Sequence, residues 1–528
     1  MNNRAQAPYE DRFLVAQQKH GEARYDEAIV DYRQLLVEQP EDLAVKVALG
    51  GALLHKDRDV EAAPLLREVW EAAPDDVAAN YYWGQYSNRQ GDHTRAYECF
   101  LRTVAAEPGH LLATKGLATL CLYRGNLDEA YHWLGSLQFF HPSAKLGAIK
   151  PQLEMLLGKR NPKRQFFCAK AKVFSRSSIS QDGPPGERDI LALNPDRFEG
   201  IVNLCGWSRL EPGTLNLALK FDFAEAAKWV APAFYEAAAD VVYPPAYESI
   251  PRRRIGYWYY RGYLYNNGAY QPMLLRRAVT PNSEEVAEVF AEHSLRETLA
   301  LSDGQTVLCY LASSEQAMQD DAWLACRLKA YDLFFDQTQQ FGRRLELYQG
   351  HEGWQLPGQR PTLHRFEQYA LGRWLTPTAR VLDIGCNIGC FGIEVASNVG
   401  SYVGFDINAS LIEVAKTLAD YHQADNCEFR TASFEDFRSS DPGQFDLIFS
   451  FAVHVWIGKP MRDYVSDLKA MLNPGGIIVI ESNDLVRNDS QFFANMSEFI
   501  REGFFLLYKG KLKDDGVINR GFCVFQLL

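Results

Sequence analysis

The chain has 528 residues, 47% of them hydrophobic and 13% aromatic, which is enough for three or four domains with packed cores. Its net charge of −12, from 67 acidic and 55 basic residues, argues against broad binding to nucleic acid. The sequence has neither an apolar run of about 18 residues nor a signal-peptide pattern, so we expect a cytoplasmic protein that meets membranes only peripherally, through a protein complex.

A 34-residue repeat covers residues 9–142. Three sets of residues keep this step: Pro40, Pro74, Pro108 and Pro142; Ala28, Ala62, Ala96 and Ala130; Tyr32, Leu66, Phe100 and Leu134. The pattern resembles the tetratricopeptide repeat, in which small residues lie where two helices cross and proline follows the second helix. The resemblance implies an all-α solenoid over residues 9–150 whose groove binds a protein partner. A purely scaffolding or dimerising role is the alternative.

Residues 165–312 predict a second, β-rich domain. Aromatic and β-branched runs bounded by turns occur at 241–245, 254–264 and 306–311. Such runs are typical of short strands. We therefore expect a small β-barrel.

A turn in this domain, Pro-Gly-Thr-Leu-Asn at 212–216, runs into alternating leucines typical of a strand. Together with the glycine-containing stretch 183–186 and the segment 288–304, it resembles the archaeal CTP-dependent riboflavin kinases, whose fold is a cradle-loop barrel. The resemblance implies that Thr214 and Asn216 contact Mg²⁺ and that Glu288 is a base for the acceptor hydroxyl. The implied nucleotide-binding residues are Gly183, Gly186, Arg188, Thr214 and Asn216. A barrel that has lost catalysis and only binds a ligand or stabilises the chain is the alternative.

Residues 375–528 contain five apolar strand segments separated by helical ones, at 381–384, 402–406, 427–431, 445–454 and 471–481. This alternation predicts an α/β domain with a doubly wound parallel sheet. The first strand leads into a glycine loop, and the second ends in Asp406, 17 residues after Gly389. An acid at that spacing suits the ribose hydroxyls of a nucleotide-like cofactor.

The five segments, in this order, resemble the class I S-adenosylmethionine-dependent methyltransferases, which have a Rossmann-like fold. The resemblance implies that Asp383, Gly385 and Gly389 hold the methionine part, Asp406 the ribose, and Ser433 and Phe434 the adenine. The neighbouring residues expected at the cofactor are Asn387, Ile407 and Phe451. A NAD-dependent dehydrogenase is the rival, but the loop is G-x-x-x-G rather than G-x-G-x-x-G.

A helical lead-in over residues 325–374 is expected to cap the cofactor site. Its polar and aromatic segment 353–369 resembles that of methyltransferases found with bacterial polysaccharide biosynthesis. Arg360 or Arg365 could pair with the cofactor's carboxylate, although either could equally belong to a solvated helix face.

His454, just after the fourth strand, is the best-placed general base for methyl transfer to oxygen, with a packing or substrate-shaping role as the alternative. Glu481 and Asn483, at the end of the fifth strand, are expected to line the same mouth.

The sequence thus predicts a bifunctional kinase–methyltransferase that uses S-adenosylmethionine, CTP and Mg²⁺ on a glycan or another polyhydroxylated acceptor. A methyltransferase with a single activity, whose repeats and barrel are binding modules, is the second hypothesis. The third is an adaptor that retains only cofactor binding.

Overall fold

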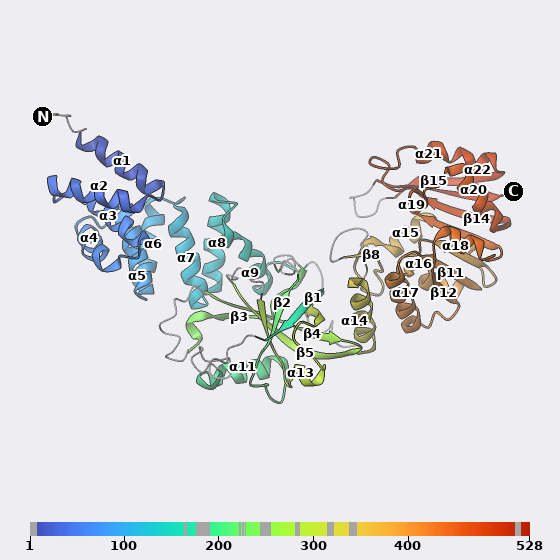
Figure 1. Cartoon of the computed structure of the whole chain (residues 1–528), viewed down its shortest axis with the longest axis horizontal. Coiled ribbons are helices and arrows are strands. Elements are labelled where there is room, and N and C mark those ends of the chain that lie inside the picture. Colours follow the sequence, from blue (N-terminus) through green and yellow to red (C-terminus); the bar gives the residue numbers. More distant parts are fainter. Residues whose placement is uncertain are drawn as a thin grey trace.

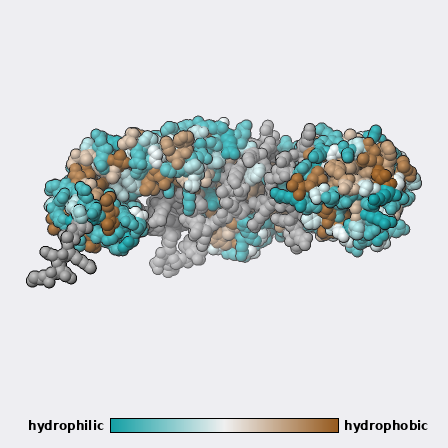
Figure 2. Space-filling view, turned by 90° about the horizontal axis from the view of Figure 1, so that it is seen from above, coloured by the Kyte–Doolittle hydropathy of each residue, from teal (hydrophilic) through white to brown (hydrophobic). Residues whose placement is uncertain are grey.

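The computed structural model describes residues 8–162, 166–175, 191–220, 223, 226, 229–242, 255–279, 286–313, 321–336, 346–512 and 519–528. They form a stack of helices, a middle antiparallel sheet and a C-terminal α/β sheet, arranged in chain order along an elongated molecule (Figure 1). No helix among the described residues is long and apolar enough to span a membrane. Hydrophilic and hydrophobic residues are interspersed over both ends of the molecule (Figure 2).

The N-terminal stack consists of eight helices that pack in consecutive pairs. They are α1 (Tyr9–Gly21), α2 (Tyr25–Glu38), α3 (Leu43–His55), α4 (Asp59–Ala72), α5 (Val77–Arg89), α6 (His93–Ala106), α7 (Leu111–Arg124) and α8 (Leu127–Phe140). Each repeat proline stands two residues after the second helix of a pair ends. A Cβ on Gly50 would lie 2.5 Å from Leu66 Cδ2, so the large residue fills the space above the small one. The expected solenoid packing is confirmed.

The solenoid continues into the middle sheet through η1 (Lys145–Ile149) and α9 (Lys150–Leu156). Leu122 and Leu134 of the helices share one hydrophobic cluster with Leu217 and Trp258 of the sheet. The Tyr235 hydroxyl donates a hydrogen bond to the carbonyl of Leu122 at 2.6 Å. The two parts are therefore joined by a common core.

The middle sheet contains seven strands among the described residues. They are β1 (Phe166–Phe174), β2 (Leu215–Leu219), β3 (Phe234–Ala237), β4 (Gly256–Asn266), β5 (Ala269–Ala278), β6 (Val286–Phe290) and β7 (Thr306–Ala312). Six strands pair antiparallel in the order β4-β5-β6-β2-β1-β7, and β7 pairs again with β4, so the hydrogen bonding forms a ring. A Cβ on Gly262 would overlap the carbonyl oxygen of Tyr310, so this pairing of β4 with β7 requires glycine.

The same part of the chain also contains the helices α11 (Pro195–Cys205), α13 (Leu295–Thr298) and the short η2 (Ala238–Asp240). The runs expected as strands at 254–264 and 306–311 fall largely in β4 and β7. Of the run expected as a strand at 241–245, Val241 and Val242 follow η2 without regular structure, and residues 243–245 lie outside the described residues.

Helix α14 (Asp321–Phe335) connects the ring to the C-terminal domain. Arg327 on this helix donates to the Tyr310 hydroxyl of β7 at 2.9 Å, and the Cys326 thiol lies 3.6 Å from the carbonyl oxygen of Thr417 in the C-terminal domain. The lead-in that follows is only partly helical. It contains the parallel strands β8 (Leu347–Gly350) and β9 (Gly358–Pro361), then α15 (Thr362–Tyr369) and η5 (Gly372–Trp374).

The C-terminal sheet has the strand order β12-β11-β10-β13-β14-β16-β15. Its strands are β10 (Arg380–Ile384), β11 (Ser401–Asp406), β12 (Cys427–Thr431), β13 (Phe445–Phe451), β14 (Leu472–Glu481), β15 (Phe504–Lys511) and β16 (Gly521–Leu527). The first five are parallel, as expected, and β16 runs antiparallel to both β14 and β15.

Helices cover both faces of this sheet (Figure 1). They are α16 (Cys390–Val395), η6 (Ala396–Asn398), α17 (Ala409–His422), α18 (Phe434–Ser439), α19 (His454–Ile457), α20 (Met461–Ala470), α21 (Phe492–Asn495) and α22 (Ser497–Arg501). The strand order reverses between β10 and β13. In open α/β sheets a ligand binds at the carboxyl ends of the strands where this reversal occurs.

Candidate active site

The loop after β10 depends on two glycines. Gly385 has φ +73° and Gly389 has φ +72°, in the left-handed region that glycine adopts without strain. A Cβ on Gly385 would lie 2.8 Å from Val453 Cγ2, and one on Gly389 would lie 2.6 Å from the Phe429 ring. The loop therefore turns tightly against the ends of β13 and β12.

Asp406, at the end of β11, holds this loop. Its Oδ2 accepts a hydrogen bond from the backbone N–H of Asn387 at 3.1 Å, and its Oδ1 accepts one from Asn408 N–H at 3.0 Å. Asn387 has φ +55°, which is unusual for a residue other than glycine. Burial raises the pKa of Asp406, although the backbone donors oppose that rise. Each carboxylate oxygen keeps a further lone pair for a hydroxyl donor.

Two buried oxygens beside the loop lack hydrogen-bond partners among the described residues, Asp383 Oδ1 and Asn387 Oδ1. Asp383 is 1% exposed, and its other oxygen accepts a hydrogen bond from the Tyr402 hydroxyl at 2.5 Å. Burial raises the pKa of Asp383 to about 7. Since buried polar atoms are normally paired, two open acceptors indicate a site for a ligand with donor groups.

Four residues expected at the cofactor have different surroundings. Ser433 caps α18, its hydroxyl accepting from Asp436 N–H at 3.1 Å, and Phe434 packs in the core against Tyr464. Ile407, by contrast, is 62% exposed directly after Asp406. Phe451 stacks on Tyr369 at 5.0 Å between ring centroids.

Arg360 and Arg365, expected at the cofactor's carboxylate, both contact the buried carboxylate of Glu481 in the structure. Arg360 Nη2 lies 2.9 Å from Glu481 Oε1, and Arg365 Nη1 lies 3.5 Å from Oε2. Arg520 Nη1 lies 3.0 Å from Oε1, and the Tyr369 hydroxyl also donates to this carboxylate. Burial acts to raise the pKa of Glu481, but the three arginines outweigh it and hold the pKa below its ordinary value.

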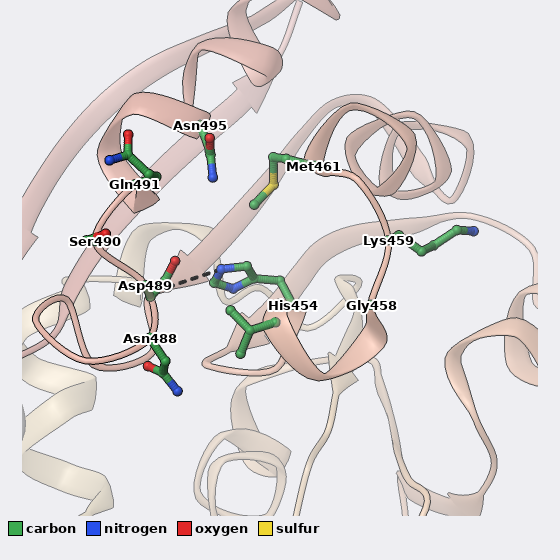
Figure 3. A pocket seen from close by; sticks show the side chains of 10 residues that line it. His454, Gly458, Lys459, Met461, Asn488, Asp489, Ser490, Gln491 and Asn495 are labelled. Atoms are coloured by element: carbon green, nitrogen blue, oxygen red, sulfur yellow. Dashed lines mark ion pairs between the residues drawn. The ribbon is translucent and has the colours of Figure 1, made fainter.

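His454 begins α19 and directly follows Val453, which lies against the glycine loop. It lines a cavity of about 270 Å³ (Figure 3). Its Nε2 lies 3.2 Å from Asp489 Oδ2. The same oxygen accepts from Asn483 N–H at 2.7 Å, and the Asn483 amide donates to the carbonyl of Ala452 at 3.1 Å. Ala452 has φ +58°, and such strained backbone often occurs at functional sites.

The middle ring brings two of its expected site residues together. Asn216 of β2 and Glu288 of β6 are direct cross-strand partners. The Glu288 carboxylate accepts from Arg276 Nε at 2.8 Å, and Arg276 is 5% exposed. Thr214 lies two residues before Asn216, just ahead of β2. Gly183, Gly186 and Arg188 lie outside the described residues, and within the described ranges no group of three or more His, Cys, Asp or Glu side chains is placed to hold a metal ion.

Residues 375–511 match the family model described as a methyltransferase domain. The C-terminal part of the chain is a methyltransferase domain. Residues 19–81 match the model described as a tetratricopeptide repeat, which agrees with the helical pairs and the 34-residue step. Neither match reaches the middle ring, so its resemblance to riboflavin kinases stays a prediction.

The curated proteins to which the chain is similar are distant relatives. Over 117 residues the chain is 33% identical to the O-antigen chain terminator bifunctional methyltransferase/kinase WbdD of Escherichia coli, covering 20% of this chain and 16% of that protein. It is 26% identical over 133 residues to the ubiquinone biosynthesis O-methyltransferase of Xanthomonas campestris pv. campestris, covering 24% of this chain and 55% of that protein. The chain thus spans about half, or less, of the length of these curated relatives.

A solved SAM-dependent methyltransferase from Thiobacillus denitrificans, in complex with S-adenosyl-L-homocysteine, is 16% identical. The match covers 31% of this chain and 90% of that one, with a TM-score of 0.26.

Sequence reasoning missed three side chains of the methyltransferase domain: Tyr369, Asp489 and Arg520. Arg520 directly precedes β16, and Asp489 lies in the loop before α21. They reach Glu481 and His454 from distant parts of the chain, so no local motif marks them. Tyr369 closes the polar and aromatic segment 353–369, which was the only signal pointing to it.

Proposed function

We propose that the chain is an S-adenosylmethionine-dependent methyltransferase that transfers the methyl group to an oxygen of a glycan or another polyhydroxylated acceptor. The glycine loop at the switch point, tied to Asp406 and bordered by two open buried oxygens, is the observation that carries this proposal. A dehydrogenase would require the G-x-G-x-x-G loop, which the sequence lacks.

The residues present fit the cofactor. Asp383 Oδ1 and Asn387 Oδ1 can accept from its ammonium group, and Asp406 can accept from the ribose hydroxyls. Ile407, exposed beside Asp406, offers an apolar surface to the adenine ring. Bound S-adenosylmethionine supplies a methyl group on a positively charged sulfur. The glycine loop and Asp406 fix the donor, and His454 removes the proton from the acceptor hydroxyl.

Calorimetric titration with S-adenosylmethionine tests this site. Asp406→Ala should weaken binding at least about tenfold, which corresponds to ~1.4 kcal/mol, whereas Asp425→Ala removes an exposed acid and should bind like the wild type. Gly385→Ala should also lose binding, because its Cβ meets Val453. Gly475→Ala is the matched control, since Gly475 has φ +76° but open space around it. Wild-type affinity in both Asp406→Ala and Gly385→Ala would overturn the proposal.

A second activity, CTP-dependent phosphoryl transfer by the middle ring, is the further candidate. It is supported by the cross-strand pairing of Asn216 with Glu288, by the six-stranded ring, which we interpret as the cradle-loop barrel, and by similarity to a bifunctional methyltransferase/kinase. Thr214 and Asn216 would hold Mg²⁺ and the nucleotide phosphates. Glu288, paired with Arg276, would serve as the base.

Transfer of label from γ-labelled CTP with Mg²⁺ to a lipid-linked glycan tests the second activity. Thr214→Ala with Asn216→Ala should abolish both transfer and CTP binding, while S-adenosylmethionine binding persists. If CTP binds neither the wild type nor the double variant and no transfer occurs, the chain has a single activity, and the repeats and the ring serve as binding modules.

A further inference from the structure

We infer that the cavity between α19 and the loop before α21 is the acceptor site of the methyltransferase domain, that it takes one polyhydroxylated ring, and that Asp489 positions His454 for proton transfer. This inference rests on the proposed methyltransferase function. It adds the location of the acceptor, the chemistry that recognises it and a residue that acts through His454.

The cavity adjoins the donor site. Val453 contacts the position where a Cβ on Gly385 would lie, and His454 is the next residue. His454 is 7% exposed, and neither of its ring nitrogens, Nδ1 or Nε2, has a hydrogen-bond partner among the described residues. A buried, unpaired ring nitrogen next to both the glycine loop and a cavity is placed to receive a ligand's proton.

The cavity lining is rich in neutral polar groups. Figure 3 shows the side chains of Asn488, Ser490, Gln491 and Asn495 on one side of the cavity, across from the segment that carries Lys459 and Met461. Amide and hydroxyl groups both donate and accept, so they match the vicinal hydroxyls of a sugar ring. A cavity of about 270 Å³ has room for roughly ten or more water-sized groups, which is enough to admit one such ring.

Asp489 lies within ion-pair distance of the imidazole. Its Oδ2 lies 3.2 Å from His454 Nε2 and is itself held by Asn483 N–H, which joins the loop to the end of β14. Nε2 makes no hydrogen bond to this carboxylate in the structure, but the nearby negative charge favours the tautomer with the proton on Nε2 and leaves the Nδ1 lone pair open.

In the transfer step, the acceptor oxygen forms a bond to the methyl carbon as the carbon–sulfur bond of the sulfonium donor breaks, and sulfur keeps that electron pair. The hydroxyl proton moves to His454 Nδ1. His454 is the catalytic residue of this step, and Asp489 is a positioning residue.

Saturation-transfer NMR with methyl α-D-glucopyranoside, on the full chain loaded with S-adenosylhomocysteine, tests the acceptor site. Wild type should bind the probe, and Gln491→Ala with Asn495→Ala should weaken binding at least tenfold. Asn398→Ala, an exposed amide outside the cavity, is the matched control. If the probe does not bind while S-adenosylhomocysteine does, or if phenol binds in its place, the acceptor-site inference and the polyhydroxylated acceptor are overturned, while the S-adenosylmethionine-dependent methyltransferase activity stands. If the wild type does not bind S-adenosylhomocysteine, the proposed function is overturned.

The positioning role of Asp489 can be tested separately by NMR of the His454 ring. In ¹⁵N-histidine spectra, the His454 ring of the wild type should carry its proton on Nε2, and Asp489→Asn should change that tautomer. Asp489→Glu should restore part of the signal, and S-adenosylhomocysteine affinity should stay unchanged in both variants. An unchanged His454 spectrum in a folded Asp489→Asn protein would rule out the positioning role.

Discussion

The Tyr402 hydroxyl donates a hydrogen bond to Asp383 Oδ2 at 2.5 Å, in the interior of the methyltransferase domain. This bond joins neighbouring parallel strands, since Asp383 lies on β10 and Tyr402 on β11. It satisfies one carboxylate oxygen and leaves the other without a hydrogen-bond partner among the described residues. The hydrogen bond lowers the pKa of Asp383, but burial dominates and places it at about 7.

Asp383 should therefore make the stability of the domain depend on pH. An unfolded aspartate has a pKa of about 3.9, so between pH ~4 and ~7 the folded state binds a proton that the unfolded state releases. The contribution of Asp383 to stability is fully present below pH ~4 and is lost as pH rises toward ~7. In chemical denaturation of the cofactor-free protein, the stability of Asp383→Asn relative to wild type should rise across this window, by at most about 4 kcal/mol. A difference that stays constant from pH 4 to pH 8 would contradict this.

Gly262→Ala should destabilise the middle ring. The new Cβ would overlap the backbone of Tyr310 at the pairing of β4 with β7, and backbone cannot move aside as a flexible side chain can. We expect a loss of about 1–3 kcal/mol or more, as for other overpacked sites, measured as a fall in the thermal transition of the ring.

Gly200→Ala is the matched control for that change. Gly200 lies within α11 with open space around it. There alanine should be neutral or stabilising by roughly 0.5–1 kcal/mol. Equal effects of the two substitutions would show that the β4–β7 contact does not constrain the ring.

Periodic features of the fold could be predicted from the sequence. The 34-residue spacing predicted the solenoid because each repeat uses the same local packing, as the contact of Gly50 with Leu66 shows. The glycine loop and Asp406 could be located because they follow strands whose carboxyl ends meet at one edge of a parallel sheet.

Contacts made by residues far apart in the chain could not be predicted. Arg520 and Arg360 meet at Glu481 from segments 160 residues apart, and neither has a local pattern that indicates a buried partner. Ser433 occupies a matching motif position, but its hydroxyl also serves as a helix cap, which the motif alone does not reveal. The common core of the solenoid and the ring likewise depends on tertiary packing that composition does not encode.

Glu481→Gln should be among the most damaging isosteric changes in the methyltransferase domain. It removes the negative charge that three buried arginines face, so their charges would be left under-compensated in the interior. Breaking a buried ion pair in this way typically costs about 3–5 kcal/mol. In a domain of this size that corresponds to a fall of roughly 10 °C in the thermal transition. Glu428→Gln breaks an exposed pair with Arg430 at 2.5 Å and should cost less than about 1 kcal/mol. If scanning calorimetry gave both variants the same transition temperature, the Glu481 cluster would not be stabilising the domain, and its arginines would be better explained as part of the ligand site.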